Sequence, residues 1–344
     1  MRPLFINHMT LLPPDSFIPQ TTLLSDLFSS SESKNDPIQE KLRNFAYFGY
    51  KTISVSHKDT GEAQMVSDCL DLLFTKIPKK SISHIVHCSP SAVLGEDGGI
   101  IGGLGRCILE KQEMNNVTYI PILGGCASLQ PVIELSSALA TYSEKSVVVI
   151  FSLHPSTMRK FAKKEKLIEN IYRASPYILF GDVSLAFVLN QFPEGEHSFQ
   201  IIQSKFVYNK EKWVAKAYFA EDFIMELNGE NQKNMLKEYL LKELVNTQKE
   251  FNVEYFFAHN QVPKIFLDII EQVKIERENA PEIVSKFGNL ACATALTNLI
   301  VNQKIVKHGS VIGLYSVGEH TGISESTIIL KSVVNGGKTV NLEK

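Results

Sequence analysis

The chain has 344 residues, a formal net charge of −2, 44% hydrophobic residues and 21% charged residues. A chain of this length buries enough surface to fold around a large core, or as two fused domains, without a disulfide or a metal. The nearly neutral charge disfavours a nucleic-acid-binding protein, because such proteins are usually basic. No uninterrupted run reaches the ~20 apolar residues that a membrane span needs, so we expect no membrane segment.

The five cysteines are scattered, and no two of them form a C-x-x-C pair. This pattern is typical of neither a disulfide framework nor a zinc site. The first residues also lack the apolar region of a signal peptide. We therefore expect a protein of the reducing cytoplasm, with neither a metal nor another cofactor.

Helix-like and strand-like stretches alternate along the chain, which predicts an α/β fold with covered sheets. In the first half the patterns predict a helix over 60–74, a strand over 83–88, a glycine-rich helix over 98–109, a strand over 117–123, a helix ending near 142, and strands over 147–151 and 185–189. In the second half they predict a long helical region over 222–250, a strand over 253–258, helices over 262–273 and 291–302, and strands over 310–317 and 326–333. A polar stretch at 191–197 separates two domains, 1–190 and 191–344.

The most informative segment runs from Val117 to Pro131. An apolar run leads to Gly124 and Gly125, Cys126 follows, and a helical pattern then begins. This order predicts a strand, a tight turn and a helix, with the thiol at the turn. Helix N-termini carry unpaired N–H groups and a partial positive charge, which favours the thiolate and makes such a cysteine nucleophilic.

Two further motifs place a polar side chain directly after an apolar stretch or a turn. His259 follows the buried strand pattern that ends at Ala258, and Asn289 follows Phe287 and Gly288. In α/β sheets the ends of strands are where sites are built. Together with Cys126, these residues are the candidate catalytic set. Asp182, in a Phe-Gly-Asp turn, is expected to be structural, because Asp readily bonds the backbone of its own turn.

These motifs, in order and spacing, resemble those of the β-ketoacyl-acyl carrier protein synthase III group of the thiolase superfamily. The counterparts are Gly-Cys-Ala-Ser at 125–128, Phe-Gly-Asp-Val-Ser at 180–184, Ala-His-Asn-Gln at 258–261 and Phe-Gly-Asn-Leu-Ala at 287–291. The resemblance implies a thiolase fold, with two duplicated βαβαβαββ halves and a five-layered αβαβα core. The half over 1–190 would carry Cys126, and the half over 191–344 would carry His259 and Asn289.

The resemblance also implies a reaction. Cys126 would attack a thioester and become acylated. His259 and Asn289 would then hydrogen-bond the carbonyl of a malonyl-type thioester and stabilise the enolate formed as carbon dioxide leaves. The enolate carbon would attack the acyl group on the cysteine and give a β-ketoacyl product.

Several positions depart from the family pattern. The segment 42–51 lacks the Trp-x-x-x-Arg motif with which the family binds coenzyme A. This absence favours an acyl group borne by a carrier protein. The segment 317–323 stands where the family has a glycine-rich closing loop that supplies an oxyanion N–H. Gly318 and His320 in this segment are therefore candidates for the oxyanion loop. Leu129 stands where a small residue is usual, so it is an acyl-pocket candidate, as are Ile100 and Ile101 in the glycine-rich stretch.

Two other readings remain open at this point. The chain could be a synthase III-like acyltransferase or head-to-head condensing enzyme that passes its acyl group to an alcohol, an amine or a second acyl chain. It could also be the partner subunit of a heteromeric synthase. The family pattern implies a homodimer, with a heterodimer as the alternative, and acyl carrier protein or coenzyme A as the carrier of the substrates.

Overall fold

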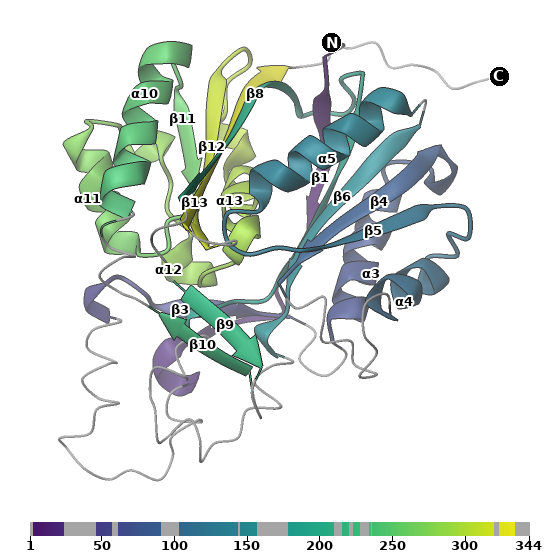
Figure 1. Cartoon of the computed structure of the whole chain (residues 1–344), viewed down its shortest axis with the longest axis horizontal. Coiled ribbons are helices and arrows are strands. Elements are labelled where there is room, and N and C mark those ends of the chain that lie inside the picture. Colours follow the sequence, from purple (N-terminus) through teal and green to yellow (C-terminus); the bar gives the residue numbers. More distant parts are fainter. Residues whose placement is uncertain are drawn as a thin grey trace.

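The computed structural model describes residues 3–23, 46–56, 61–90, 103–143, 145–156, 178–209, 215–219, 223–227, 234, 236–319 and 323–333. These residues form a nine-stranded mixed sheet with helices packed on it, and two small two-stranded sheets (Figure 1). The α/β class predicted from the sequence is therefore confirmed.

The described elements before residue 191 are β1 (Phe5–Leu11), β2 (Ser16–Pro19), β3 (Thr52–Val55), α3 (Glu62–Phe74), η1 (Lys79–Ser81), β4 (Ile82–Ser89), α4 (Gly103–Lys111), β5 (Thr118–Leu123), α5 (Leu129–Tyr142), β6 (Ser146–Leu153) and β7 (Val183–Asn190). Those after it are β8 (Ser198–Asn209), β9 (Ala215–Phe219), β10 (Phe223–Leu227), η2 (Leu236–Leu240), α10 (Leu241–Phe251), β11 (Tyr255–Ala258), α11 (Pro263–Gln272), η3 (Arg277–Asn279), α12 (Val284–Phe287), η4 (Ala291–Ala293), α13 (Thr294–Asn302), η5 (Gln303–Ile305), β12 (Val311–Glu319) and β13 (Ile323–Val333).

The strand order of the large sheet is β11-β12-β13-β8-β1-β7-β6-β4-β5. On one side of the β1–β8 contact, β7 runs antiparallel to both β1 and β6, while β4 is parallel to β6 and β5. On the other side, β13 runs antiparallel to both β8 and β12, while β12 is parallel to β11. Counted outward from this contact, the two halves repeat the same order and strand directions. Among the described strands, β5 has no counterpart in the second half.

Helices lie on both outer faces of the sheet and also between its two halves. Figure 1 shows α3 and α4 on one side of the molecule and α10 and α11 on the other, with α5 and α13 between them. Helix α5 contacts β6 and β7 of the first half and β8 and β13 of the second, and α13 contacts β1 as well as β11 and β12. The central helices therefore bury apolar side chains from both halves, in the largest hydrophobic cluster.

The central strands are buried on both faces, as strands covered by helices usually are. In β6, Val147, Val149 and Phe151 join the central cluster, whereas Val148 and Ile150 pack toward α3 and α4. The continuous apolar run at 147–151 is thus explained by burial on two sides.

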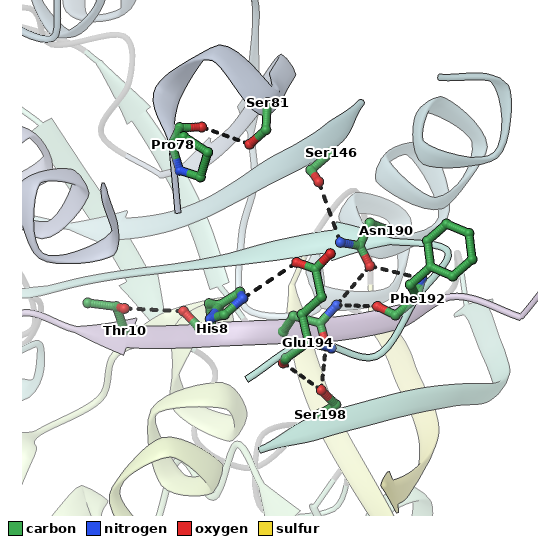
Figure 2. A network of polar contacts seen from close by, with 10 residues as sticks. His8, Thr10, Pro78, Ser81, Ser146, Asn190, Phe192, Glu194 and Ser198 are labelled. Carbon is green, nitrogen blue, oxygen red and sulfur yellow. Dashed lines mark hydrogen bonds and ion pairs between the residues drawn. The ribbon is translucent and has the colours of Figure 1, made fainter. Parts of the chain in front are cut away.

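Polar side chains hold the junction of the halves, among them Asn190, Glu194 and Ser198 in Figure 2. They gather around Asn7 of β1. Its Nδ2 donates to Oδ1 of Asn190 at 2.8 Å, and its Oδ1 accepts from Oγ of Ser198 at 2.7 Å and from the backbone N–H of Glu194 at 2.9 Å. His8 beside it has φ 51°, where the register of β1 shifts, and its Nε2 lies 3.5 Å from a Glu194 oxygen. This network fixes the connection between β7 and β8 onto β1.

One predicted element is wrong. The region expected to be helical over 222–250 contains the strand β10 (Phe223–Leu227), paired antiparallel with β9, before the described helices η2 and α10. A short apolar run fits a strand or a helix equally well by periodicity, and pairing with β9 decides between them.

Candidate functional site

Cys126 lies in the turn between β5 and α5. It is partly exposed and not disulfide-bonded, and α5 begins three residues later, at Leu129. The turn packs tightly, since a Cβ on Gly124 would lie 2.5 Å from Sγ of Cys88. Oγ of Ser326, in β13, accepts a hydrogen bond from the backbone N–H of Gln130 at 2.5 Å. The start of α5, and with it Cys126, is therefore tied to the second half of the sheet.

The last residues of strand β12 pack directly against Cys126. Oγ of Ser316 donates a hydrogen bond to the carbonyl oxygen of Cys126. A Cβ on Gly318 would lie 2.4 Å from Cβ of Cys126 and 3.5 Å from its Sγ. Only a residue without a side chain fits here, so the structure places Gly318, one of the predicted loop residues, beside the thiol.

His259 directly follows β11 and is fully buried. Its backbone N–H donates to the carbonyl of Tyr315 at 2.7 Å, which aligns it with β12. Its Nδ1 lies 3.1 Å from the carbonyl oxygen of Val317, and its Nε2 lies 2.8 Å from Oδ1 of Asn289. Burial lowers the pKa of His259, against smaller opposing effects of these two contacts, so the ring is neutral near neutral pH.

Asn289 lies between α12 and η4, where its backbone N–H donates to the carbonyl of Leu179 at 2.7 Å. Its Oδ1 also accepts from the backbone N–H of Ala291 at 2.8 Å. Gly288 and Ala291 on either side have φ of 78° and 49°, so the chain is sharply turned at this residue. No described residue accepts a hydrogen bond from Nδ2 of Asn289, which leaves that amide group available to a ligand.

The structure thus brings the three predicted catalytic residues to one strand end. Cys126 contacts β12 at Ser316 and Gly318, and His259 contacts it at Val317, while Asn289 bonds to His259. Successive residues of a strand rise only ~3.3 Å, so these contacts lie within one short stretch. The arrangement combines a thiol at a helix start with a neutral imidazole and a carboxamide.

Sequence reasoning missed Gln261, two residues after His259. Its Nε2 donates to the carbonyl of Val317 at 2.8 Å and would lie 3.0 Å from a Cβ on Gly318. The side chain is 4% exposed and therefore belongs to the inner wall beside Cys126. The only sequence signal was a long amide in the histidine motif.

The remaining candidates are the predicted acyl-pocket residues and the second predicted loop residue. Leu129 is fully buried in the central hydrophobic cluster, whereas Ile100, Ile101 and His320 lie outside the described residues.

Asp182 has the structural role that we expected, although its hydrogen bonds are not to its own turn. Its carboxylate accepts from the backbone N–H of Ser56 at 2.9 Å, and from the N–H and Oγ of Ser156 at 3.0 and 2.5 Å. It therefore joins distant segments instead of capping its own turn.

Within the described part of the chain, no group of three or more His, Cys, Asp or Glu side chains could hold a metal ion. No described helix has both the length and the apolar character needed to cross a membrane. Comparison with protein-family models found none that matches the chain, and comparison with curated proteins found no match either.

Proposed function

We propose that the protein is a thiolase-type condensing enzyme, similar to β-ketoacyl-acyl carrier protein synthase III, that acylates Cys126 and then performs a decarboxylative Claisen condensation. The proposal rests on one observation: neighbouring residues of β12 contact both Cys126, just before α5, and His259, which is bonded to Asn289. A nucleophile and two polar groups so placed suit acyl transfer followed by enolate stabilisation.

The architecture supports the thiolase assignment. The strand order and directions repeat on the two sides of the β1–β8 contact. Helices α5 and α13 lie between the halves and further helices lie on the two outer sides, an arrangement that supports the proposed five-layered core. The catalytic residues come from both halves, with Cys126 from the first and His259 and Asn289 from the second. The division into domains 1–190 and 191–344 stays a prediction.

In the first step the Cys126 thiolate attacks the carbonyl carbon of an acyl thioester. A new carbon–sulfur bond forms, the carbon–sulfur bond to the carrier breaks, and the carrier leaves as a thiolate that takes up the proton lost by Cys126. The start of α5 supplies N–H groups and a partial positive charge near the thiolate. Backbone N–H groups of the turn, that of Cys126 among them, would hold the oxyanion of the tetrahedral intermediate.

In the second step a malonyl-type thioester loses carbon dioxide. The electron pair of the breaking carbon–carbon bond becomes an enolate, whose oxygen needs hydrogen-bond donors. Nδ2 of Asn289 has no acceptor among the described residues, and the imidazole of His259 lies beside it. The enolate carbon then attacks the acyl group, and Cys126 leaves as a thiolate.

The proposed partners are thioesters borne by acyl carrier protein or coenzyme A, in the cytoplasm, with a homodimer as the working form. The outer edge of β5 has no described strand beside it, which leaves backbone groups for pairing with a second chain. A heterodimer with a related chain is the alternative.

Mass spectrometry of the intact protein tests the nucleophile. After incubation with a panel of acyl-coenzyme A and acyl-carrier-protein thioesters, we expect one acyl group per chain, mapped to Cys126. The variant Cys126→Ala should take up no acyl group, whereas the control Cys107→Ser, in α4 on the outer face, should be acylated like the wild type. Acylation of folded Cys126→Ala would leave the mechanism untenable.

Release of labelled carbon dioxide from malonyl thioester separates condensation from the acyltransferase alternative. We expect carbon dioxide and a β-ketoacyl product from the acylated protein. Acylation without carbon dioxide release, but with transfer to an alcohol or amine, would favour the acyltransferase. Absence of any adduct in folded protein would favour a partner subunit.

A further inference from the structure

The hydrogen bonds around His259 contain a conflict over one proton. A neutral imidazole has one N–H, yet both ring nitrogens of His259 face oxygens that act only as acceptors. These oxygens are the carbonyl of Val317, 3.1 Å from Nδ1, and Oδ1 of Asn289, 2.8 Å from Nε2. Oδ1 is fixed as an acceptor because it also receives the backbone N–H of Ala291 at 2.8 Å. One of the two nitrogens must therefore face an oxygen with its lone pair.

Gln261 provides the missing donor on one side. Its Nε2 donates to the same Val317 carbonyl at 2.8 Å, a shorter contact than that of Nδ1. Val317 is 3% exposed, and a buried carbonyl without a donor costs about 1–3 kcal/mol. While Gln261 is present, the carbonyl therefore does not need the proton of His259.

The contact with Asn289 then favours the ring proton on Nε2. A proton on Nε2 makes the 2.8 Å hydrogen bond to Asn289 and leaves the lone pair of Nδ1 at the longer distance, 3.1 Å. The opposite tautomer would bring a lone pair of Nε2 to within 2.8 Å of an acceptor oxygen. Repulsion between lone pairs increases as the distance decreases, so the first arrangement has the lower energy.

We propose that Gln261 is a positioning residue, which donates to the Val317 carbonyl and so keeps the single ring proton of His259 on Nε2, toward Asn289. Its contribution to catalysis rests on the proposed condensation, whereas the position of the proton does not. With the proton on Nε2, that N–H can be shared between Oδ1 of Asn289 and an entering thioester oxygen, to which Nδ2 of Asn289 also donates. With the proton on Nδ1, the lone pair of Nε2 would repel the developing enolate.

The direct test is the tautomer of His259, read from the ring ¹⁵N resonances of protein labelled in histidine. The variant His259→Asn identifies the signals by their loss. We expect Nε2–H in the wild type and a shift toward Nδ1–H in Gln261→Met, which keeps the length of the side chain but has no N–H. Gln261→Leu also lacks the donor and serves if Gln261→Met does not fold.

The matched control is Gln112→Met. Gln112 is also a buried glutamine whose Nε2 donates to a backbone carbonyl, that of Ser67 at 3.0 Å, but it packs against α3 on the outer face. This variant should leave the His259 signals unchanged. Nδ1–H in the wild type, or an unchanged Nε2–H in Gln261→Met and Gln261→Leu, would overturn the proposal.

The catalytic consequence is measured separately, as the rate of carbon dioxide release from malonyl-coenzyme A. We expect a loss of about 10²-fold in Gln261→Met, comparable to the loss of one oxyanion donor, and none in Gln112→Met. If the wild type releases no carbon dioxide from any malonyl thioester, the proposed function fails while the tautomer result stands. If the tautomer shifts but the rate does not, Gln261 sets the proton without a role in catalysis.

Discussion

Asp182 shows how one side chain can join segments that are far apart in sequence. Its carboxylate accepts three hydrogen bonds, from Ser56 and Ser156, and it is 2% exposed. Asp182→Ala would remove the acceptor of these three hydrogen bonds from a buried site, so we expect unfolding in urea to show a loss of about 3 kcal/mol. Asp268→Ala, at an exposed position of α11, is the control and should change stability by less than about 0.5 kcal/mol. A loss as small as that of the control would contradict the structural role.

Gly318 is expected to be intolerant of any side chain. A Cβ there would lie 2.4 Å from Cβ of Cys126 and would displace either β12 or the thiol. Because misplacement by ~1 Å can cost about 10²-fold in rate, we expect Gly318→Ala to slow acylation of Cys126 by about that factor. Gly103→Ala is the matched control, since its Cβ would meet no atom within 4 Å. Equal acylation rates for the two variants would show that the turn at Cys126 can shift without slowing acylation.

At the residue scale, the sequence predicts which side chains form the candidate site better than it predicts their contacts. Cys126, His259 and Asn289 were identifiable because each follows an apolar stretch or a turn with a recognisable motif. Gln261 was not, because its partner Val317 lies 56 residues away and no local pattern links them. The hydrogen bond from Ser56 to Asp182 spans 126 residues, and no local pattern predicts it either.

At the scale of elements, a buried polar chain connects β5, β4, β6 and α3. The Tyr119 hydroxyl contacts Nδ1 of His87, and Nε2 of His87 lies 2.6 Å from Oγ of Ser152. Oγ of Ser152 in turn donates to Oε1 of Glu62 at 2.5 Å, as does Ser89 at 2.7 Å. All these hydrogen bonds form at once if the Tyr119 hydroxyl donates to Nδ1 of a neutral His87. Nε2–H of His87 then donates to Ser152, and Ser152 donates to Glu62.

This network predicts how stability depends on pH. Burial lowers the pKa of His87 to about 4, with a smaller opposing effect of Glu62. Between this value and about 6.5, its pKa in the unfolded chain, the unfolded chain binds a proton that the folded protein does not. The free energy of unfolding should therefore fall as the pH falls, by about 2 kcal/mol between pH ~7 and pH ~5.

Urea titrations at both pH values measure this loss. Burial also lowers the pKa of His259, which acts in the same direction. The variant His87→Gln removes one of the two groups, so its stability should depend less steeply on pH. An equally steep dependence in that variant would show that His87 is not the main source.

Among the elements, the helix after Cys126 and the fully buried strands were predictable, because their apolar runs are long and their turns carry glycine. Strands β1 and β8, which join the two halves, were not identified, and β10 was mistaken for part of a helix. Each depends on a partner strand for its conformation. β-Propensity reflects packing against neighbours more than an intrinsic backbone preference, so such strands are poorly marked in a single sequence.

At the scale of the whole molecule, the proposed dimer depends on the exposed edge of β5. Leu123 at its end is 60% exposed, and Ile122 is half-buried, although Pro121 removes one donor from the strand. We expect sedimentation velocity to show a dimer of the wild type and a shift to monomer in Leu123→Arg, because a charge at a paired edge opposes pairing. Tyr142→Arg, at a residue that is 92% exposed, should remain dimeric. A monomeric wild type, or loss of the dimer in both variants, would argue against this edge.

The sequence by itself determined the mixed α/β class, the turn that carries Cys126 and the identity of the residues with reactive side chains. These features depend on neighbours along the chain, through periodicity, turn residues and helix ends. Only the tertiary structure decided that the sheet repeats its strand order across β1 and β8, and that the end of β12 gathers Cys126, His259, Asn289 and Gln261. The physical reason is that these contacts join residues far apart in the chain, and their geometry is set by the packing of α5 and α13 between the two halves.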